Sequence, residues 1–190
     1  MAINYLKIVG QPVLTIESGE KISRVKDFLI DPQNGKFLGI FCTQRGLILT
    51  IKFFIAARDI KNFGESAVMI VDRKVLENPY KNFKVAEILN SKIEIRGNKV
   101  LTESGQHLGE VRDYEVDLGV NKLSRLVVAS GIFRDMFRGE LLITHSQIVS
   151  IGRDAIIVRD TVIKEAQSMR AKVPKQGLSP APMCIKKEEA

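Results

Sequence analysis

The chain has 190 residues, of which 45% are hydrophobic and none is tryptophan, and its formal net charge is +7. No stretch reaches the roughly 18 uninterrupted apolar residues of a membrane-spanning helix, and the N-terminus lacks the charged start and long apolar core of a signal peptide. With only two cysteines, Cys42 and Cys184, there is no disulfide framework, and we expect a cytoplasmic protein.

The first half of the chain is predicted to form short strands separated by turns. The runs are apolar and β-branched and too short for independent helices: residues 24–30, 37–42, 47–55 and 67–71. Side-chain alternation along the first run predicts Phe28 and Ile30 on one face and Val25 on the other. A turn is expected at residues 31–35, which begin with Asp31 and end with Gly35.

The middle and the end of the chain have different signals. Residues 77–91 are predicted to be a connector, in which Asn82 caps a short helix that runs through Leu89. Residues 164–190 are predicted to make a helical turn and then a disordered basic tail, because proline, glycine and serine accumulate there.

The second half repeats the first. Val13-Leu14-Thr15 returns as Val100-Leu101-Thr102, and residues 18–31 return as residues 104–117, which gives an offset of 86 or 87. This period is longer than the roughly 20 to 50 residues of solenoid repeats, so each copy is predicted to be a small domain. The predicted fold is all-β, with two tandem small antiparallel β-barrels at residues 3–76 and 92–163.

The positive charge is spread along the chain. Residues 97–163 carry eight basic and nine acidic side chains, so the second copy is slightly acidic. The sequence therefore has no concentrated basic domain of the kind that nonspecific phosphate binding favours.

The repeated segment resembles a known family. The pattern Val-x-x-x-x-Gly-x-x-Leu-Gly-x-Val-x-Asp-x-x-Val-Asp, which residues 100–117 follow with one position of slack, is similar to the opening hairpin of the PRC-barrel. The later residues 154–158 resemble its closing strands. The first copy departs from the family at Ser23, where the family favours glycine, and has Ser66 where the second copy has Asp154.

The resemblance implies a role in protein binding and assembly. Relatives include the cytoplasmic domain of the photosynthetic reaction-centre H subunit, which supports a membrane complex, and the RimM ribosome-maturation factor, which contacts a ribosomal protein. We therefore expect a non-enzymatic adaptor with a protein partner. Two alternatives are a ribosome- or RNA-associated factor like RimM and a peripheral component of a photosynthetic or other membrane complex. Fold alone does not choose among them.

The sequence offers little catalytic chemistry. His107 and His145 have no cysteines at zinc-binding spacing, and no phosphate-binding glycine-rich loop is present. Carboxylates four residues apart occur in both copies, as Asp27 with Asp31 and Asp113 with Asp117, which leaves open a paired acid-base or metal site.

Their repetition favours a structural role for these carboxylates. Asp31 and Asp117 begin turns that contain Gly35 and Gly119, where an aspartate side chain accepts backbone N–H bonds. Glu115 adds a third carboxylate and at best a weak cation site. We expect no catalytic residues, no metal and no cofactor.

One segment has no counterpart in the first copy. Residues 132–139 replace the shorter Thr43–Gly46 and contain residue types that are enriched in interface anchors. The predicted partner-binding residues are Phe133, Arg134, Met136, Phe137 and Arg138. The alternatives are that the two phenylalanines cover the barrel end or the seam between the copies, or that they insert into a membrane surface.

Overall fold

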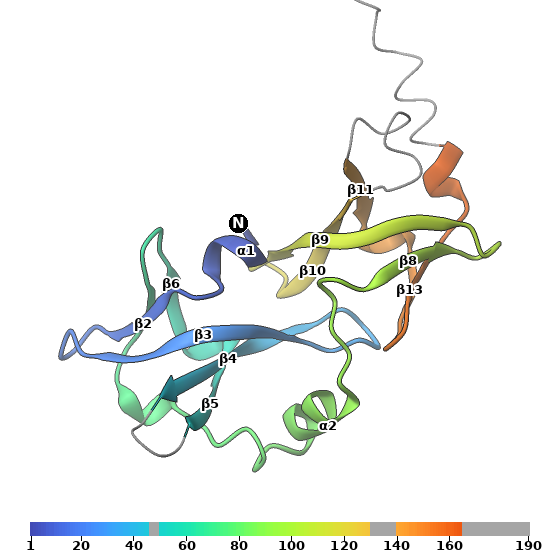
Figure 1. Cartoon of the computed structure of the whole chain (residues 1–190). Helices are drawn as coiled ribbons and strands as arrows, with labels where there is room; N and C mark the ends of the chain where they lie inside the picture. The colour runs from blue at the N-terminus through green and yellow to red at the C-terminus, as the bar shows by residue number, and fades with distance from the viewer. Residues whose placement is uncertain (46–49, 130–139, 165–190) are drawn as a thin grey trace, which may run out of the picture.

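The computed structural model describes residues 1–45, 50–129 and 140–164 (Figure 1). In this part of the chain almost all regular structure is β, arranged as two sheets. No helix of the described residues is long and apolar enough to cross a membrane.

The first copy of the repeat forms a six-stranded sheet with the order β5-β4-β3-β2-β7-β6. A 3-10 turn (Ala57–Asp59) joins β5 to β6, and a second one (Arg73–Val75) follows β7. The strands are β2 (Pro12–Thr15), β3 (Lys21–Ile30), β4 (Phe37–Arg45), β5 (Thr50–Ala56), β6 (Ile60–Phe63) and β7 (Val68–Ile70).

The second copy has the same strand order, β11-β10-β9-β8-β13-β12. A 3-10 turn (His145–Gln147) takes the place of the one between β5 and β6. The strands are β8 (Lys99–Thr102), β9 (His107–Asp117), β10 (Lys122–Ala129), β11 (Glu140–Thr144), β12 (Ile148–Ile151) and β13 (Ile156–Val158). The repeat in the sequence is therefore also a repeat in the topology.

The prediction of closed, antiparallel barrels is wrong. In each copy the last strand pairs parallel with the first, β7 with β2 and β13 with β8, so both sheets are mixed. The 3-10 turn after β5 directs the chain away from that strand, and β6 pairs with β7 instead. As a result β5 and β6 lie at opposite ends of the strand order, and the sheet does not close between them.

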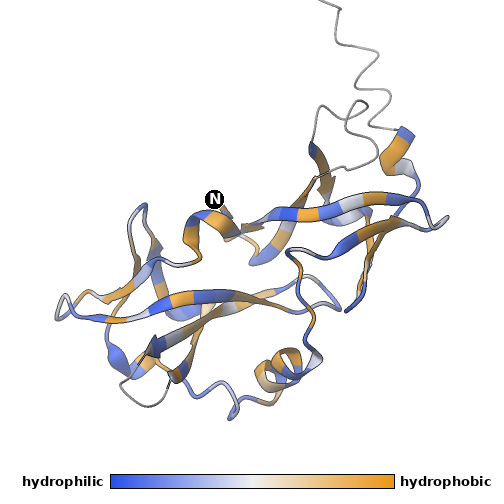
Figure 2. Cartoon of the chain, in the orientation of Figure 1, coloured by the Kyte–Doolittle hydropathy of each residue, from blue (hydrophilic) through white to orange (hydrophobic). Residues whose placement is uncertain are grey.

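The long strands β3 and β9 follow the expected alternation only in part (Figure 2). A register shift in the pairing with the next strand falls between Val25 and Asp27 in β3, and between Val111 and Asp113 in β9. Because a bulge adds one residue to the strand, Val25 and Phe28 both point into the same core, contrary to the prediction.

Two sets of backbone contacts join the copies: the N-terminal strand of the chain pairs with the second copy, and the turns of the two copies pair with each other. β1 (Ala2–Asn4) precedes the first copy in sequence but pairs antiparallel with β9 of the second, Ile3 lying opposite Val116. The turns that follow β3 and β9 also pair, since Phe37 N donates to Asn121 O and Leu123 N donates to Gly35 O, each at 2.8 Å. The sheets are thus joined by backbone hydrogen bonds as well as by side chains.

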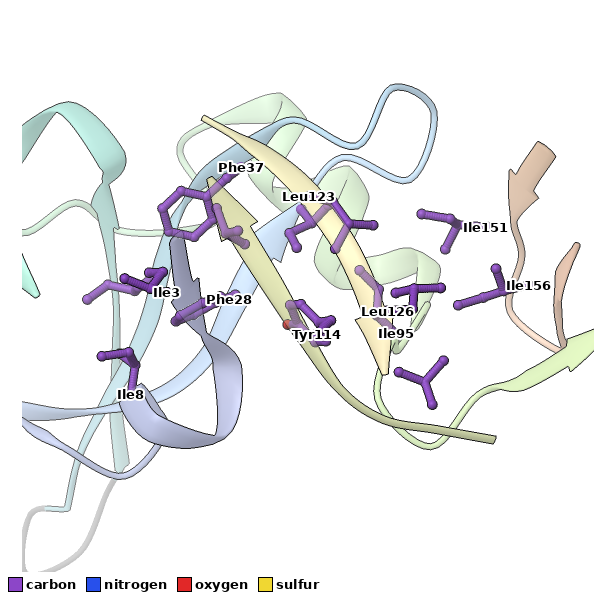
Figure 3. Close-up of a cluster of buried hydrophobic side chains, with 14 of the residues drawn as sticks. Ile3, Ile8, Phe28, Phe37, Ile95, Tyr114, Leu123, Leu126, Ile151 and Ile156 are labelled. Carbon is purple, nitrogen blue, oxygen red and sulfur yellow. The ribbon is translucent and has the colours of Figure 1, made fainter. Parts of the chain in front are cut away.

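One hydrophobic core runs through both copies (Figure 3). Tyr5 of α1 (Tyr5–Ile8) stacks on Tyr114 with ring centroids 4.6 Å apart, and its edge meets Phe28 at 5.4 Å. Phe28 also packs on Phe37 at 5.2 Å. Each copy is too small to bury much apolar surface alone, so this shared core is the main source of stability for both.

The helix expected in the connector is confirmed. α2 (Phe83–Ser91) begins after Asn82, whose side chain accepts the Val85 N–H at 3.3 Å. Val85 and Ile88 are buried against the outer face of the first sheet, where they form a second core with residues of β3 and β5: Leu29, Phe54 and Ala56.

Candidate functional site

The predicted partner-binding residues Phe133, Arg134, Met136, Phe137 and Arg138 lie outside the described residues. The same is true of the predicted tail after residue 164. These assignments stay predictions, and the candidate surfaces below come from the rest of the chain.

The predicted turn residues lie where the two copies meet. Asp31 is buried, and its side chain accepts hydrogen bonds from Gln33 N at 3.1 Å and Asn34 Nδ2 at 3.0 Å. Lys84 of α2 approaches the same carboxylate at 3.5 Å, so Asp31 also holds the helix. Gly35 has φ +69°, and an added Cβ would lie 2.3 Å from His145 Nε2 of the second copy.

Asp117 is the counterpart of Asp31 in the second copy. Its Oδ1 accepts the Gly119 N–H at 2.8 Å, and this bond is the main cause that lowers the pKa of Asp117. Both turn aspartates therefore bind backbone or neighbouring amide groups of their own turns, and the positive φ in the second turn falls on Asn121, not on Gly119.

A cavity of about 460 Å³ lies between β3, the end of α2 and residues 92–96. Polar and apolar atoms contribute about equally to its lining, which includes Tyr5 and Tyr114. Asp27 is the acidic group of β3 on this wall. The bulge next to Asp27 places its carboxylate beside the shared aromatic core, where its Oδ1 accepts the Phe28 N–H at 2.8 Å.

Burial perturbs the titratable groups around this cavity. It raises the pKa of Asp27, against the lowering effects of the hydrogen bonds from Phe28 N–H and the Tyr5 side chain. Burial, followed by the negative charge of Asp27, also raises the pKa of Tyr5 and of Tyr114. These groups belong to the contact between the copies, which accounts for all three shifts.

Asp27→Asn is expected to raise the free energy of unfolding at pH 7. The raised pKa means that folding favours the protonated carboxyl, so its stabilising effect is complete below the unfolded pKa of about 3.9 and is lost as the pH rises through the folded value. Asparagine keeps the acceptor oxygen without the buried charge.

Urea unfolding of both proteins between pH 4 and pH 7 measures this effect. The stability difference should be greatest at pH 7 and should shrink towards pH 4. Asp154→Asn is the control, because the Asp154 side chain is 92% exposed and its substitution should change nothing. A variant of Asp27 that is less stable than the parent protein at pH 7 would contradict the interpretation.

A second surface lies beside the edge strand β5. A groove of about 830 Å³ is lined by residues of β5 and of the segment before α2, including Ile51, Lys52 and Lys81. Ile51 in its lining is 50% exposed, and Tyr80 and Phe83, which flank the lining residues Lys81 and Asn82 in the sequence, are exposed by 54% and 85%. Lys52 Nζ lies 3.4 Å from the Tyr80 hydroxyl and extends over its ring.

Neither surface was predicted from the sequence. The signal for Phe83 was available, because Phe83 is out of phase with the apolar positions Val85, Ile88 and Leu89 that the helix must bury. The role of Tyr5 had no such signal, since it depends on a contact between segments more than 100 residues apart.

These observations define a mostly β tandem protein in which two copies of one six-stranded unit share a core. The model of the PRC-barrel domain matches residues 2–76 and 93–162, once in each copy. The chain therefore belongs to the PRC-barrel domain family. Comparison with curated proteins gives no match.

Proposed function

We propose that the chain is a non-enzymatic adaptor that binds another protein through the surface beside β5. The observation that carries this proposal is a groove lined by the exposed Ile51, next to a segment in which Tyr80 and Phe83, on either side of the lining residues Lys81 and Asn82, are also exposed. Exposed apolar groups in one place are typical of protein interaction sites, and aromatic side chains are the usual anchors of such sites.

The backbone beside this groove supports the same proposal. Phe54 of β5 exchanges two hydrogen bonds with Glu77, each at 2.9 Å, and this pairing fixes the segment that forms the far wall of the groove. Lys52 and Lys81 add positive charge to the groove, so we expect a partner surface that is apolar at its centre and acidic at its rim.

The titratable groups support a role without catalysis. Three of the groups with a perturbed pKa, Asp27, Tyr5 and Tyr114, interact with one another in the contact between the copies, where they have a structural use.

Replacing Ile51 with Thr, Tyr80 with Ser and Phe83 with Ser together should abolish recovery of the partner by affinity purification from the native cell. The three side chains are exposed, so the melting temperature should change little. The matched control replaces Leu142 and Val149, which are 55% and 50% exposed in the second copy, and should leave recovery unchanged. Equal recovery with the triple variant and the parent protein would contradict the proposal.

Two alternatives make different predictions. A ribosome- or RNA-associated role is supported by the net charge of +7 and by the resemblance to RimM, and it predicts co-sedimentation with ribosomes that weakens steeply with salt. A role in a photosynthetic or other membrane complex is supported by the resemblance to the reaction-centre H subunit, and it predicts recovery in the membrane fraction. Failure of each prediction at low salt counts against that alternative.

A further inference from the structure

The segments that precede the two copies are counterparts in sequence. Ile8 corresponds to Ile95 and Gly10 to Gly97, so residues 2–8 correspond to residues 89–95. Residues 2–8 lie on β9 of the second copy, and residues 89–95 lie beside β3 of the first. Each copy therefore presents the same edge of its long strand to the leading segment of the other.

On β9 this edge is filled by a strand. β1 pairs with residues 115–117, and Leu118 N donates to Met1 O at 2.9 Å. Beyond the paired residues, Leu6 N donates to Asp113 Oδ1 at 3.1 Å. β1 is thus held by backbone pairing along the edge, and Asp113 binds a main-chain N–H in the first turn of α1, which follows β1.

The corresponding edge of β3 differs. Among the described residues no strand pairs with this edge at residues 29–31, because the counterparts of β1 are residues 89–91, which form the end of α2. A helix cannot continue a sheet, and the cavity of about 460 Å³ remains between it and β3. Asp27, the counterpart of Asp113, lines this cavity, and no described main-chain N–H outside β3 donates to it.

We propose that this cavity is a strand-addition site, in which an extended peptide segment of a partner protein pairs with β3 as β1 pairs with β9. A main-chain N–H of the peptide donates to Asp27, as Leu6 N does to Asp113. Strand addition to a sheet edge is a common form of peptide recognition, in which main-chain bonds supply affinity and side-chain pockets supply specificity.

The lining of the cavity defines the chemistry of the peptide. Leu29 stands where β9 has Glu115, so the paired part of the peptide is apolar. Lys26, Lys92 and Arg96 outnumber Glu94 at the rim, which favours an acidic residue on the exposed side of the peptide. Pro32 replaces Leu118 and has no N–H, so the pairing ends at residue 31.

The site is separate from the groove beside β5, and it depends on the proposed function only in that both bind proteins. The probe is the capped peptide acetyl-Glu-Ala-Ile-Leu-Tyr-Leu-amide, which is residues 1–6 with Met1 replaced by Glu, outside the paired part, and with Asn4, the residue opposite Glu115 in β9, replaced by Leu. Titration into the isotope-labelled full chain should shift the amide signals of residues 27–31 and 88–95. A peptide N-methylated at its isoleucine should bind at least about tenfold more weakly, because it lacks a strand N–H.

Two variants complete the test. Ile93→Trp fills the cavity and should weaken peptide binding at least about tenfold, whereas Leu6→Trp, at the counterpart position on the second copy, should not. The variant of Ile51, Tyr80 and Phe83 should bind the peptide normally, which separates this site from the groove. Shifts confined to residues 113–117, no binding, or equal binding of the N-methylated peptide would overturn the proposal, and the peptide comparison holds even if Ile93→Trp does not fold.

Discussion

Phe28→Ala is expected to lower the free energy of unfolding of the whole chain by about 3–5 kcal/mol. Phe28 is only 5% exposed and lies at the centre of the aromatic cluster that joins the two copies. Its ring has partners from both of them: Tyr5, Phe37, Phe63 and Tyr114. Loss of the ring leaves a cavity that neither sheet can close alone.

Urea unfolding followed by circular dichroism measures this loss. Phe83→Ala is the matched control, because Phe83 is 85% exposed and its removal should change the free energy of unfolding by less than about 0.5 kcal/mol. Equal effects of the two substitutions would contradict the shared core. A biphasic curve for Phe28→Ala, with one copy unaffected, would do the same.

Gly39→Ala is expected to destabilise the chain by at least about 3 kcal/mol. Gly39 lies in β4 with φ +151°, and an added Cβ would be 2.1 Å from the Ile55 carbonyl oxygen and 2.9 Å from Ala56 Cα. These are backbone atoms of a paired strand, so no side-chain rotation relieves the clash. Relief would require β4 and β5 to separate.

The control for this substitution is Gly19→Ala. Gly19 has φ +66°, but an added Cβ meets nothing within 4 Å, so only the backbone conformation is penalised, by about 1 kcal/mol. Thermal unfolding of the two variants separates the two effects. A melting temperature for Gly39→Ala as high as that for Gly19→Ala would show that the close approach of β4 and β5 is not as described.

The sequence contained most of the local structure. The repeat predicted two equivalent units, the apolar runs predicted their central strands, and Asn82 predicted the start of α2. Each of these features depends on residues close together in the chain, where side-chain period and capping chemistry act directly.

The features that the sequence did not reveal depend on long-range pairing. An apolar run such as residues 67–71 looks the same whether its neighbour is parallel or antiparallel, so the parallel pairing of β7 with β2 could not be predicted. The pairing of β1 with β9 of the other copy likewise has no local signal, because three residues are too few for a pattern. The bulge before Asp27 appears only when β3 is paired with β4.

For the candidate surfaces too, local features could be predicted from the sequence and features that depend on long-range contacts could not. The repetition of the aspartates directed attention to the turns, where Asp31 and Asp117 bind groups of their own segments. Asp27 and Asp113 share a sequence pattern, yet one borders a cavity and the other binds α1, because a helix precedes one copy and a strand precedes the other. Equivalent positions in the two copies can therefore have different surroundings, and only the structure shows this difference.

Native-state hydrogen exchange tests most directly whether the two copies form one cooperative unit. The amides of Ile55 in the first copy and Ile143 in the second belong to fully buried residues of corresponding strands. Their exchange, measured against urea concentration, should converge on one free energy of opening equal to that of global unfolding. Separate free energies, with one copy opening while the other stays protected, would contradict the shared core on which the proposed adaptor is built.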